Sequence, residues 1–278
     1  MIFETVGNKE KPVILMLNGS FSTGAGLLHI AEMISDEFYI IFPTYDGHHE
    51  NGGSFTTRDD QAGKIISYLK KEGIGHLALV QGASMGAEIA LTFASKMPEA
   101  GISVDQYLFD GGPFFHFSGW LRAIMRMKFK SMVHQAQHGS YEEITERFSK
   151  NKMVQWMIHG DISPYKWFIK GLADSAPFMS DASIGKESDA CYTFDYPEAS
   201  SEEQKKYLFI WSTNEPAFKS YEKIRKHYPN AKYWSPGDIG HCGYISRKPD
   251  EYAVFLRKLA KQEWCEETWK EKDIEKLR

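Results

Sequence analysis

Cysteine is scarce in this chain, which has only three in 278 residues: Cys191, Cys242 and Cys265. The number is odd and the positions lie far apart, which argues against a disulfide framework of the kind that staples small secreted domains. Thiols stay free where the surroundings are reducing. The scarcity of cysteine therefore predicts a cytoplasmic protein.

The chain also lacks long apolar runs and blocks of one charge. Nowhere do about 18 apolar residues follow one another, and the first residues do not join a basic stretch to an apolar one. We therefore expect neither a membrane span nor an export signal. The 33 basic and 37 acidic residues are interspersed and leave a net charge of -4. Without a basic face, nucleic acid is not an expected partner.

What the chain does contain is enough apolar material for a large core, since 42% of its residues are hydrophobic. Short apolar runs, typical of strands covered on both faces, occupy residues 12–17, 38–42, 76–80, 105–109, 207–211 and 231–234. Helical patterns lie between them, such as residues 57–71, which place Ile65 and Leu69 on one face. This alternation predicts an α/β fold, with a mostly parallel sheet flanked by helices on both sides.

The alternation stops between Phe114 and about Ser201, where helical segments rich in methionine and aromatic residues take over. We therefore expect a core formed by residues 1–113 and 202–278, with residues 114–201 as a helical insertion. Eight apolar side chains of the insertion are candidates for an acyl or aryl pocket: Phe114, Phe115, Phe117, Trp120, Met125, Trp156, Trp167 and Phe168. Because inserted helices must bury an apolar face, we assign most of the eight to packing.

The strongest local signal is Gly82–Gly86, a serine between two glycines that follows an apolar run and precedes a helical pattern. The helical pattern places Ile89 and Phe93 on one face, and we expect it to stop at Pro98. The glycines leave room for a sharp turn from strand to helix, with the Ser84 hydroxyl at its apex. The start of the helix favours an anion at the same place. The pattern predicts a nucleophile elbow, suited to attack on a carbonyl group.

A serine needs a base to take its proton, and the base works best beside a carboxylate. Among ten histidines, His241 alone follows the last predicted strand in a glycine-rich loop. That position would present it at the carboxyl edge of the sheet, beside Ser84.

Another histidine pair, His48 and His49, lies in a polar loop. Neighbouring residues point in different directions, and no partners stand at metal-ligand spacing. We therefore expect a solvated loop, and the sequence implies no metal or organic cofactor.

With the elbow at Gly82–Gly86 and a histidine loop at Asp238–His241, the chain resembles the α/β-hydrolase superfamily over about residues 12–261, the insertion excepted. The resemblance implies an acid after the strand that follows the insertion, often beside a proline, and so makes Glu215 the carboxylate. Asp110, at the end of an earlier strand, is the alternative that some relatives use. Both obey the chain order serine, acid, histidine.

The resemblance also implies an oxyanion hole and a cap. The two backbone N–H donors of the oxyanion hole would come from Met85, the residue after the nucleophile, and from the loop Asn18-Gly19-Ser20, with Ser20 as the donor. Many relatives have histidine-glycine where this chain has Asn18-Gly19, so the match in this loop is partial. The helical insertion corresponds to the cap.

These features predict a carboxylesterase-like serine hydrolase that cleaves a small carboxylic ester or related acyl compound through an acyl-enzyme. A thioesterase, a carbon–carbon bond hydrolase and an aminopeptidase would use the same triad. The aminopeptidase would need an acid in the cap to hold the substrate amine, for which Glu142, Glu143 or Glu146 is available. A further alternative is a ligand-binding protein that has kept the fold without turnover. The tail with Trp264 and Trp269 would form either a last helix on the core or a contact in a homodimer.

Overall fold

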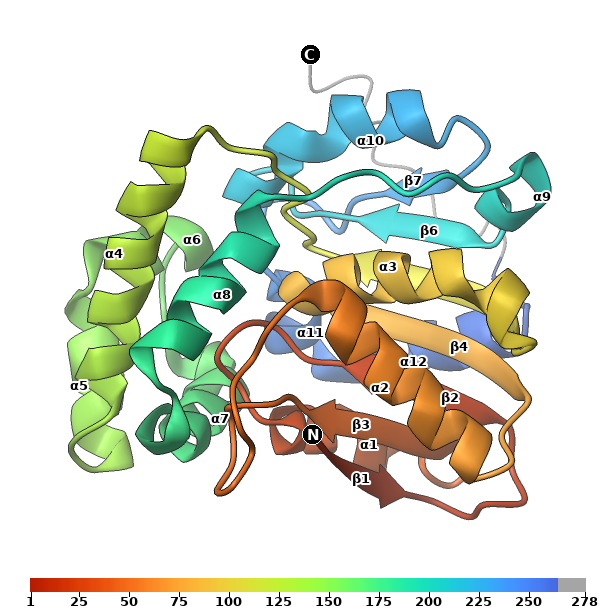
Figure 1. Cartoon of the computed structure of the whole chain (residues 1–278), viewed down its shortest axis with the longest axis horizontal. Coiled ribbons are helices and arrows are strands. Elements are labelled where there is room, and N and C mark those ends of the chain that lie inside the picture. The colour runs from red at the N-terminus through yellow and green to blue at the C-terminus, as the bar shows by residue number, and fades with distance from the viewer. Residues whose placement is uncertain (265–278) are drawn as a thin grey trace.

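One seven-stranded sheet organises the computed structural model, which describes residues 1–264 (Figure 1). Its strands are β1 (Ile2–Val6), β2 (Val13–Leu17), β3 (Tyr39–Thr44), β4 (His76–Ala83), β5 (Ser103–Asp110), β6 (Tyr207–Ile210) and β7 (Lys232–Trp234). They lie in the order β1-β3-β2-β4-β5-β6-β7. Every neighbouring pair is parallel except β1 and β3. The predicted mostly parallel sheet is therefore confirmed, and β1 is an antiparallel edge strand that the apolar runs did not indicate.

The parallel strands are buried on both faces, which explains their continuous apolar sequences. Along β2, Leu15 and Leu17 join one hydrophobic cluster and Ile14 and Met16 the other. The first cluster includes residues of α2 (Arg58–Lys71), α3 (Met85–Ala100) and α10 (Tyr221–His227), which follows the 3₁₀ turn Pro216–Ser220. The second includes residues of α1 (Leu28–Ile34), α11 (Gly243–Arg247) and α12 (Pro249–Ala260). In Figure 1, α2 and α3 lie in front of the sheet and α12 behind it.

Helix α3 is longer than its sequence predicts, because Pro98 does not end it. The helix runs to Ala100, and Gly101 follows in the left-handed conformation with φ of +70°. In the last turn, proline removes a single hydrogen bond to the carbonyl of Ala94, and the helix continues without it. Glycine, which adopts positive φ at little cost, ends it instead.

Residues 114–201, here called the insertion, contain helices only, apart from one isolated β-bridge. These helices are α4 (Gly119–Ala136), α5 (Tyr141–Lys150), α6 (Lys152–Ile158), α7 (Lys166–Ser175) and α8 (Asp181–Tyr192), with α9 (Ser201–Gln204) at the boundary. Figure 1 shows α4 to α8 gathered beside one end of the sheet. Because side chains of α4, α6, α7 and α8 share a cavity with Ser84, which follows β4, this end is the one where the parallel strands finish.

The chain's last described residue, Trp264, is buried against the second hydrophobic cluster and lies under the ammonium group of Lys232. Trp269 and Cys265 lie outside the described residues. The other two cysteines are buried free thiols. None of the helices within residues 1–264 combines the length and hydrophobicity that a membrane crossing needs.

Candidate active site

The turn between β4 and α3 holds Ser84 in a backbone conformation that residues other than glycine rarely adopt, with φ of 55° and ψ of -121°. Its two glycines are sterically required. A Cβ atom on Gly82 would lie 2.3 Å from the carbonyl oxygen of Gly86, and one on Gly86 would lie 2.2 Å from that of Leu17. The turn is therefore as tight as the Gly82–Gly86 pattern predicts, and it presents Ser84 beyond the end of β4.

Two further side chains meet Ser84 from loops that follow β6 and β7. The Nε2 atom of His241 lies 3.0 Å from Oγ of Ser84, and Nδ1 of His241 is hydrogen-bonded to Oε2 of Glu215. The other carboxylate oxygen of Glu215 accepts a hydrogen bond of 2.7 Å from the backbone N–H of Ser212. This second bond fixes the carboxylate against the imidazole. Ser84, His241 and Glu215 thus form one continuous hydrogen-bonded chain.

Asp110, the alternative acid, has a different neighbour. It is buried at the end of β5, beside Tyr252 of α12. Burial, and then the nearby charge of Glu215, raise its pKa to about 7. The structure therefore brings Glu215 onto His241, whereas Asp110 lies beside Tyr252 of the helix behind the sheet.

The electrostatics of this site favour a charged imidazole. Burial acts to lower the pKa of His241, but neighbouring Cys242 and the Glu215 carboxylate raise it above the ordinary histidine value. Burial raises the pKa of the Cys242 thiol itself to about 11, so the thiol is neutral at pH 7. The carboxylate is then the charge that stabilises the imidazolium. Cys242, whose Sγ lies 3.8 Å from Nε2 of His241, does not compete with Ser84 as a thiolate nucleophile.

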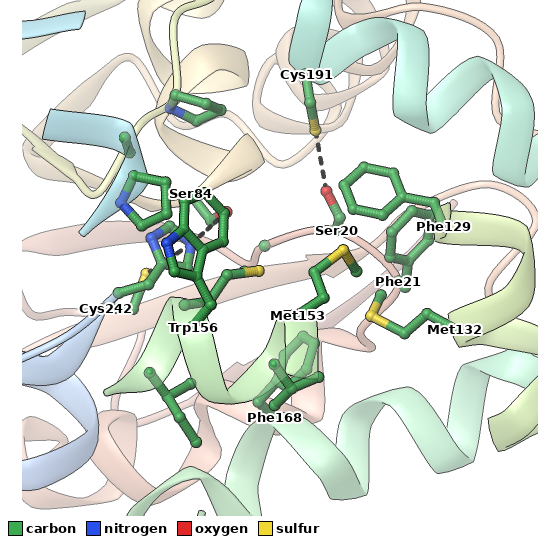
Figure 2. A pocket seen from close by; sticks show the side chains of 18 of the residues that line it. Ser20, Phe21, Ser84, Phe129, Met132, Met153, Trp156, Phe168, Cys191 and Cys242 are labelled. Atoms are coloured by element: carbon green, nitrogen blue, oxygen red, sulfur yellow. Dashed lines mark hydrogen bonds between the residues drawn. The ribbon is translucent and has the colours of Figure 1, made fainter. Parts of the chain in front are cut away.

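Both backbone segments predicted to supply oxyanion donors lie beside Ser84. Met85 is the first residue of α3, so its N–H has no acceptor within the helix. Gly19 approaches from the loop after β2, where an added Cβ atom would lie 3.2 Å from Cβ of Ser84. The next residue, Ser20, lines the same cavity as Ser84, and its hydroxyl lies 3.2 Å from the Cys191 thiol of α8 (Figure 2).

A cavity of about 630 Å³ opens next to Ser84 and His241, between the core and the insertion. Its lining is mainly apolar and includes four methionines: Met125, Met132, Met153 and Met157. Figure 2 shows Phe129, Met132 and Met153 on the side of the cavity away from Ser84 and Cys242. The space therefore extends well beyond the serine.

Six of the eight candidate pocket residues line this cavity, more than the packing argument predicts. They are Phe115, Phe117, Met125, Trp156, Trp167 and Phe168. The other two do not: Phe114 is fully buried against Phe109 and Phe209, and Trp120 is 67% exposed. The sequence shows apolar faces but not which of them remain uncovered.

The charged residues of the cavity are two lysines, Lys128 and Lys152, together with His241. Within residues 1–264 no aspartate or glutamate belongs to its lining. Glu143 and Glu146 instead line a separate surface hollow. The insertion therefore does not offer the cavity the acid that a substrate amine would require.

The loop after β3 differs from its prediction. His48 is fully buried rather than solvated, and its Nε2 lies 3.1 Å from Oε1 of Glu187, which is also fully buried, in α8. His49 is only partly covered. No local pattern could have revealed the pair, because Glu187 comes 139 residues later in the chain. Among the residues described, no three His, Cys, Asp or Glu side chains come together as a metal site.

No protein-family model matches the sequence, and no curated relative matches it. The structure is similar to a protein from Desulfitobacterium hafniense described as an α/β-hydrolase family member (TM-score 0.70, 14% identity, 93% of this chain and 99% of that one). It is also similar to a carboxylesterase structure from Nitrososphaera gargenis (TM-score 0.71, 17% identity, 94% of this chain and 95% of that one). A third similar structure is an enol-lactonase from Burkholderia xenovorans LB400 (TM-score 0.66, 14% identity, 94% of this chain and 96% of that one). At these identities the likeness establishes the fold, which is the α/β-hydrolase fold.

Proposed function

We propose that this chain of the α/β-hydrolase fold is a serine hydrolase that cleaves a carboxylic ester or a related acyl compound through an acyl-enzyme. One observation carries the proposal: the hydrogen-bonded chain from Ser84 through His241 to Glu215 lies beside a large apolar cavity. A receptor that had lost turnover would have no need of this alignment.

Each residue has a role in the proposed reaction. His241 accepts the proton of Ser84 as its Oγ attacks the substrate carbonyl carbon, and Glu215 stabilises the resulting imidazolium. The N–H groups of Met85 and Ser20 stabilise the oxyanion of the tetrahedral intermediate. His241 then donates its proton to the leaving group. In the second half-reaction His241 activates a water molecule, which releases the acid from Ser84.

The cavity supports an apolar acyl or aryl substrate, and we propose that the insertion acts as the cap over it. About 630 Å³ lies within the range of small-molecule sites and accommodates more than a short acid. The aminopeptidase alternative is disfavoured, because the described lining contains no acid for the substrate amine while it does contain Lys128 and Lys152. The same triad could also cleave a thioester or a carbon–carbon bond. Esters are therefore the first of several substrate classes to test.

An active-site-directed fluorophosphonate tests this proposal. The wild-type protein should take one label, at Ser84, and should hydrolyse p-nitrophenyl butyrate. Ser84→Ala should lose both properties while keeping the thermal unfolding midpoint within a few degrees, or higher. Ser95→Ala is the matched control, since Ser95 lies in α3, the helix that follows Ser84, and does not line the cavity. Labelling at another residue, or an active Ser84→Ala protein, would refute the mechanism.

A further inference from the structure

The loop after β2, which carries Ser20, is held by the insertion rather than by the core alone. Phe21 has a φ of 62°, unusual for a residue with a side chain, and both of its backbone polar groups bind insertion side chains. Its N–H donates to Oε1 of Glu187 at 2.9 Å, and its carbonyl oxygen accepts from Oγ of Ser175 at 2.5 Å. A third bond joins the N–H of Thr23 to the carbonyl oxygen of Gly171 at 3.3 Å.

Besides the N–H of Phe21, Glu187 contacts a second buried group. Its partner His48 places Nε2 3.1 Å from Oε1 of Glu187 and Nδ1 3.1 Å from the carbonyl oxygen of Asp46. When Glu187 is ionised, both ring nitrogens face acceptors, and the imidazolium, with an N–H on each, satisfies both. Burial opposes this charge, but Glu187 raises the pKa of His48 above its ordinary value. A compensated carboxylate then accepts the Phe21 N–H, and such a bond is about twice as strong as a neutral one.

We propose that Glu187 is a positioning residue for the oxyanion hole, acting through Phe21 on the backbone of Ser20. The inference rests on the function proposed above. The peptide bond between Ser20 and Phe21 contains the N–H that Glu187 binds, so this contact restrains the dihedral angles of both residues. Without it, Phe21 would be free to leave its strained conformation, and the Ser20 N–H would turn away from the oxyanion.

A merely structural role for Glu187 would fasten α8 to the core without affecting turnover, and α8 contains a control for that role. Ser183, fully buried one turn earlier in the same helix, accepts a 3.1 Å hydrogen bond from the N–H of Phe55. This bond fastens α8 to the core at a loop that does not carry Ser20. Ser183→Ala therefore removes a fastening contact and spares the loop of Phe21.

The experiment compares wild type, Glu187→Gln, Ser175→Ala and Ser183→Ala in hydrolysis of p-nitrophenyl butyrate. Loss of an oxyanion donor costs about 100- to 1000-fold in kcat, and a displaced donor should cost roughly 10- to 100-fold. We expect Glu187→Gln to lower kcat by that amount with KM within about twofold, because the oxyanion exists only in the transition state. Ser175→Ala, which loosens the other side of Phe21 and removes no charge, should show a smaller loss of the same kind.

Two readouts separate positioning from weakened folding. Inhibition by an acyl trifluoromethyl ketone, which forms an oxyanion on Ser84, should weaken in parallel with kcat in Glu187→Gln. Hydrogen exchange should accelerate in the peptide containing residues 18–24. Ser183→Ala should keep kcat, inhibition and this exchange near wild type even if its unfolding midpoint falls as far.

The outcomes are distinguishable. An active wild type in which Glu187→Gln and Ser183→Ala have the same kcat would overturn the inference alone. So would a loss in Glu187→Gln that appears only in KM. A wild type that hydrolyses no ester and takes no fluorophosphonate would overturn the proposed function and the inference with it.

Discussion

Ser84 is held in a conformation whose cost is of the order of 1–3 kcal/mol, and the surrounding turn has no freedom to relax it. Side chains are absent where they would collide, at Gly82 and Gly86, and the backbone of β2 passes within 2.2 Å of where a Cβ of Gly86 would lie. The serine is therefore fixed before a substrate arrives. His241 and Glu215 can be placed against it with little further adjustment.

The acid assignment yields a prediction on individual residues. Glu215→Gln should lower kcat by up to about 10⁴-fold, because the amide no longer stabilises the imidazolium of His241. Asp110→Asn, matched in chemistry and also buried, should keep most of the activity, since the carboxylate bonded to His241 is that of Glu215. Steady-state kinetics on p-nitrophenyl butyrate compares the two. An active Glu215→Gln beside an inactive Asp110→Asn would transfer the role to Asp110.

The same pair of variants should differ in the pH dependence of the activity that remains. Glu215 raises the pKa of His241, and activity requires the neutral imidazole, so wild-type kcat/KM should fall as pH drops below that raised pKa. Removing the charge in Glu215→Gln lowers the pKa of His241. The fall of kcat/KM on the acid side, called the acid limb, should then move to lower pH. Asp110→Asn should leave the limb nearly in place.

Local motifs and the resemblance together could identify the three residues of the proposed triad, but not the residues that support them. Ser84 and His241 stand in glycine-rich loops next to predicted strands, and Glu215 follows from the resemblance. We could expect the three residues to lie close together because each follows a predicted strand, and parallel strands end at the same edge of the sheet. His48 and Glu187 have no such signal, since each becomes informative only when the other is brought beside it by the insertion.

At the level of elements, the insertion helices supply much of the cavity lining. Side chains from α4, α6, α7 and α8 line it, and their apolar faces are shared between packing and open space. Sequence periodicity finds these faces, because it reports which side of a helix is apolar. It does not find the space between them, because that depends on how the helices are placed relative to one another.

Acyl chain length should therefore control kcat/KM until the cavity is full. A buried methylene is worth about 0.8 kcal/mol, or roughly fourfold per carbon. Hydrolysis of p-nitrophenyl esters from acetate to decanoate should rise steeply and then level off. Met132→Trp, which adds volume on the side of the cavity away from Ser84, should move the plateau to shorter chains without changing acetate hydrolysis.

Helix α4 itself provides the control for this series. Met127 lies on its outer side, 64% exposed and outside the cavity lining, so Met127→Trp should reproduce the wild-type profile. A flat wild-type series would show that the cavity does not hold the acyl group. A plateau that moves equally in both variants would show that Met132 does not limit the chain.

At the scale of the whole molecule, the insertion contacts more than one loop of the proposed active site. Besides the bonds to Phe21, the carbonyl oxygen of Met157 in the insertion accepts a 2.9 Å hydrogen bond from the backbone N–H of His241. The mostly parallel sheet was predictable because buried strands have continuous apolar sequences. The edge strand β1 was not, because Ile2 and its neighbours are partly exposed and follow no such run. How the insertion sits on the loops depends on contacts between distant residues, which no local pattern contains.

The stability of the whole fold should depend on pH through Glu88, which is fully buried in α3. Burial raises its pKa from 4.5 to about 8, so the folded protein holds a proton that the unfolded chain releases. The contribution of Glu88 is complete below pH 4.5 and is lost as pH rises to about 8. Over that interval the free energy of unfolding should fall by up to about 1.4 kcal/mol per pH unit from this group.

Urea unfolding at pH 5, 7 and 9 measures this loss. Glu88→Gln cannot ionise, so its stability relative to wild type should increase steadily with pH. Glu142→Gln, an exposed change in α5, should follow wild type at every pH. A constant difference between Glu88→Gln and wild type would mean that Glu88 is ionised in the folded protein throughout this range.

The four methionines of the cavity make the proposed active site sensitive to oxidants. Thioethers are flexible and polarisable, so they suit acyl groups of varied shape. Peroxide converts them to sulfoxides, which are polar and would render the lining of Met125, Met132, Met153 and Met157 hydrophilic. Damage would then appear first as a loss of preference for long chains, while the serine and its histidine remained intact. Methionine sulfoxide reductases could restore that preference without new synthesis of the protein.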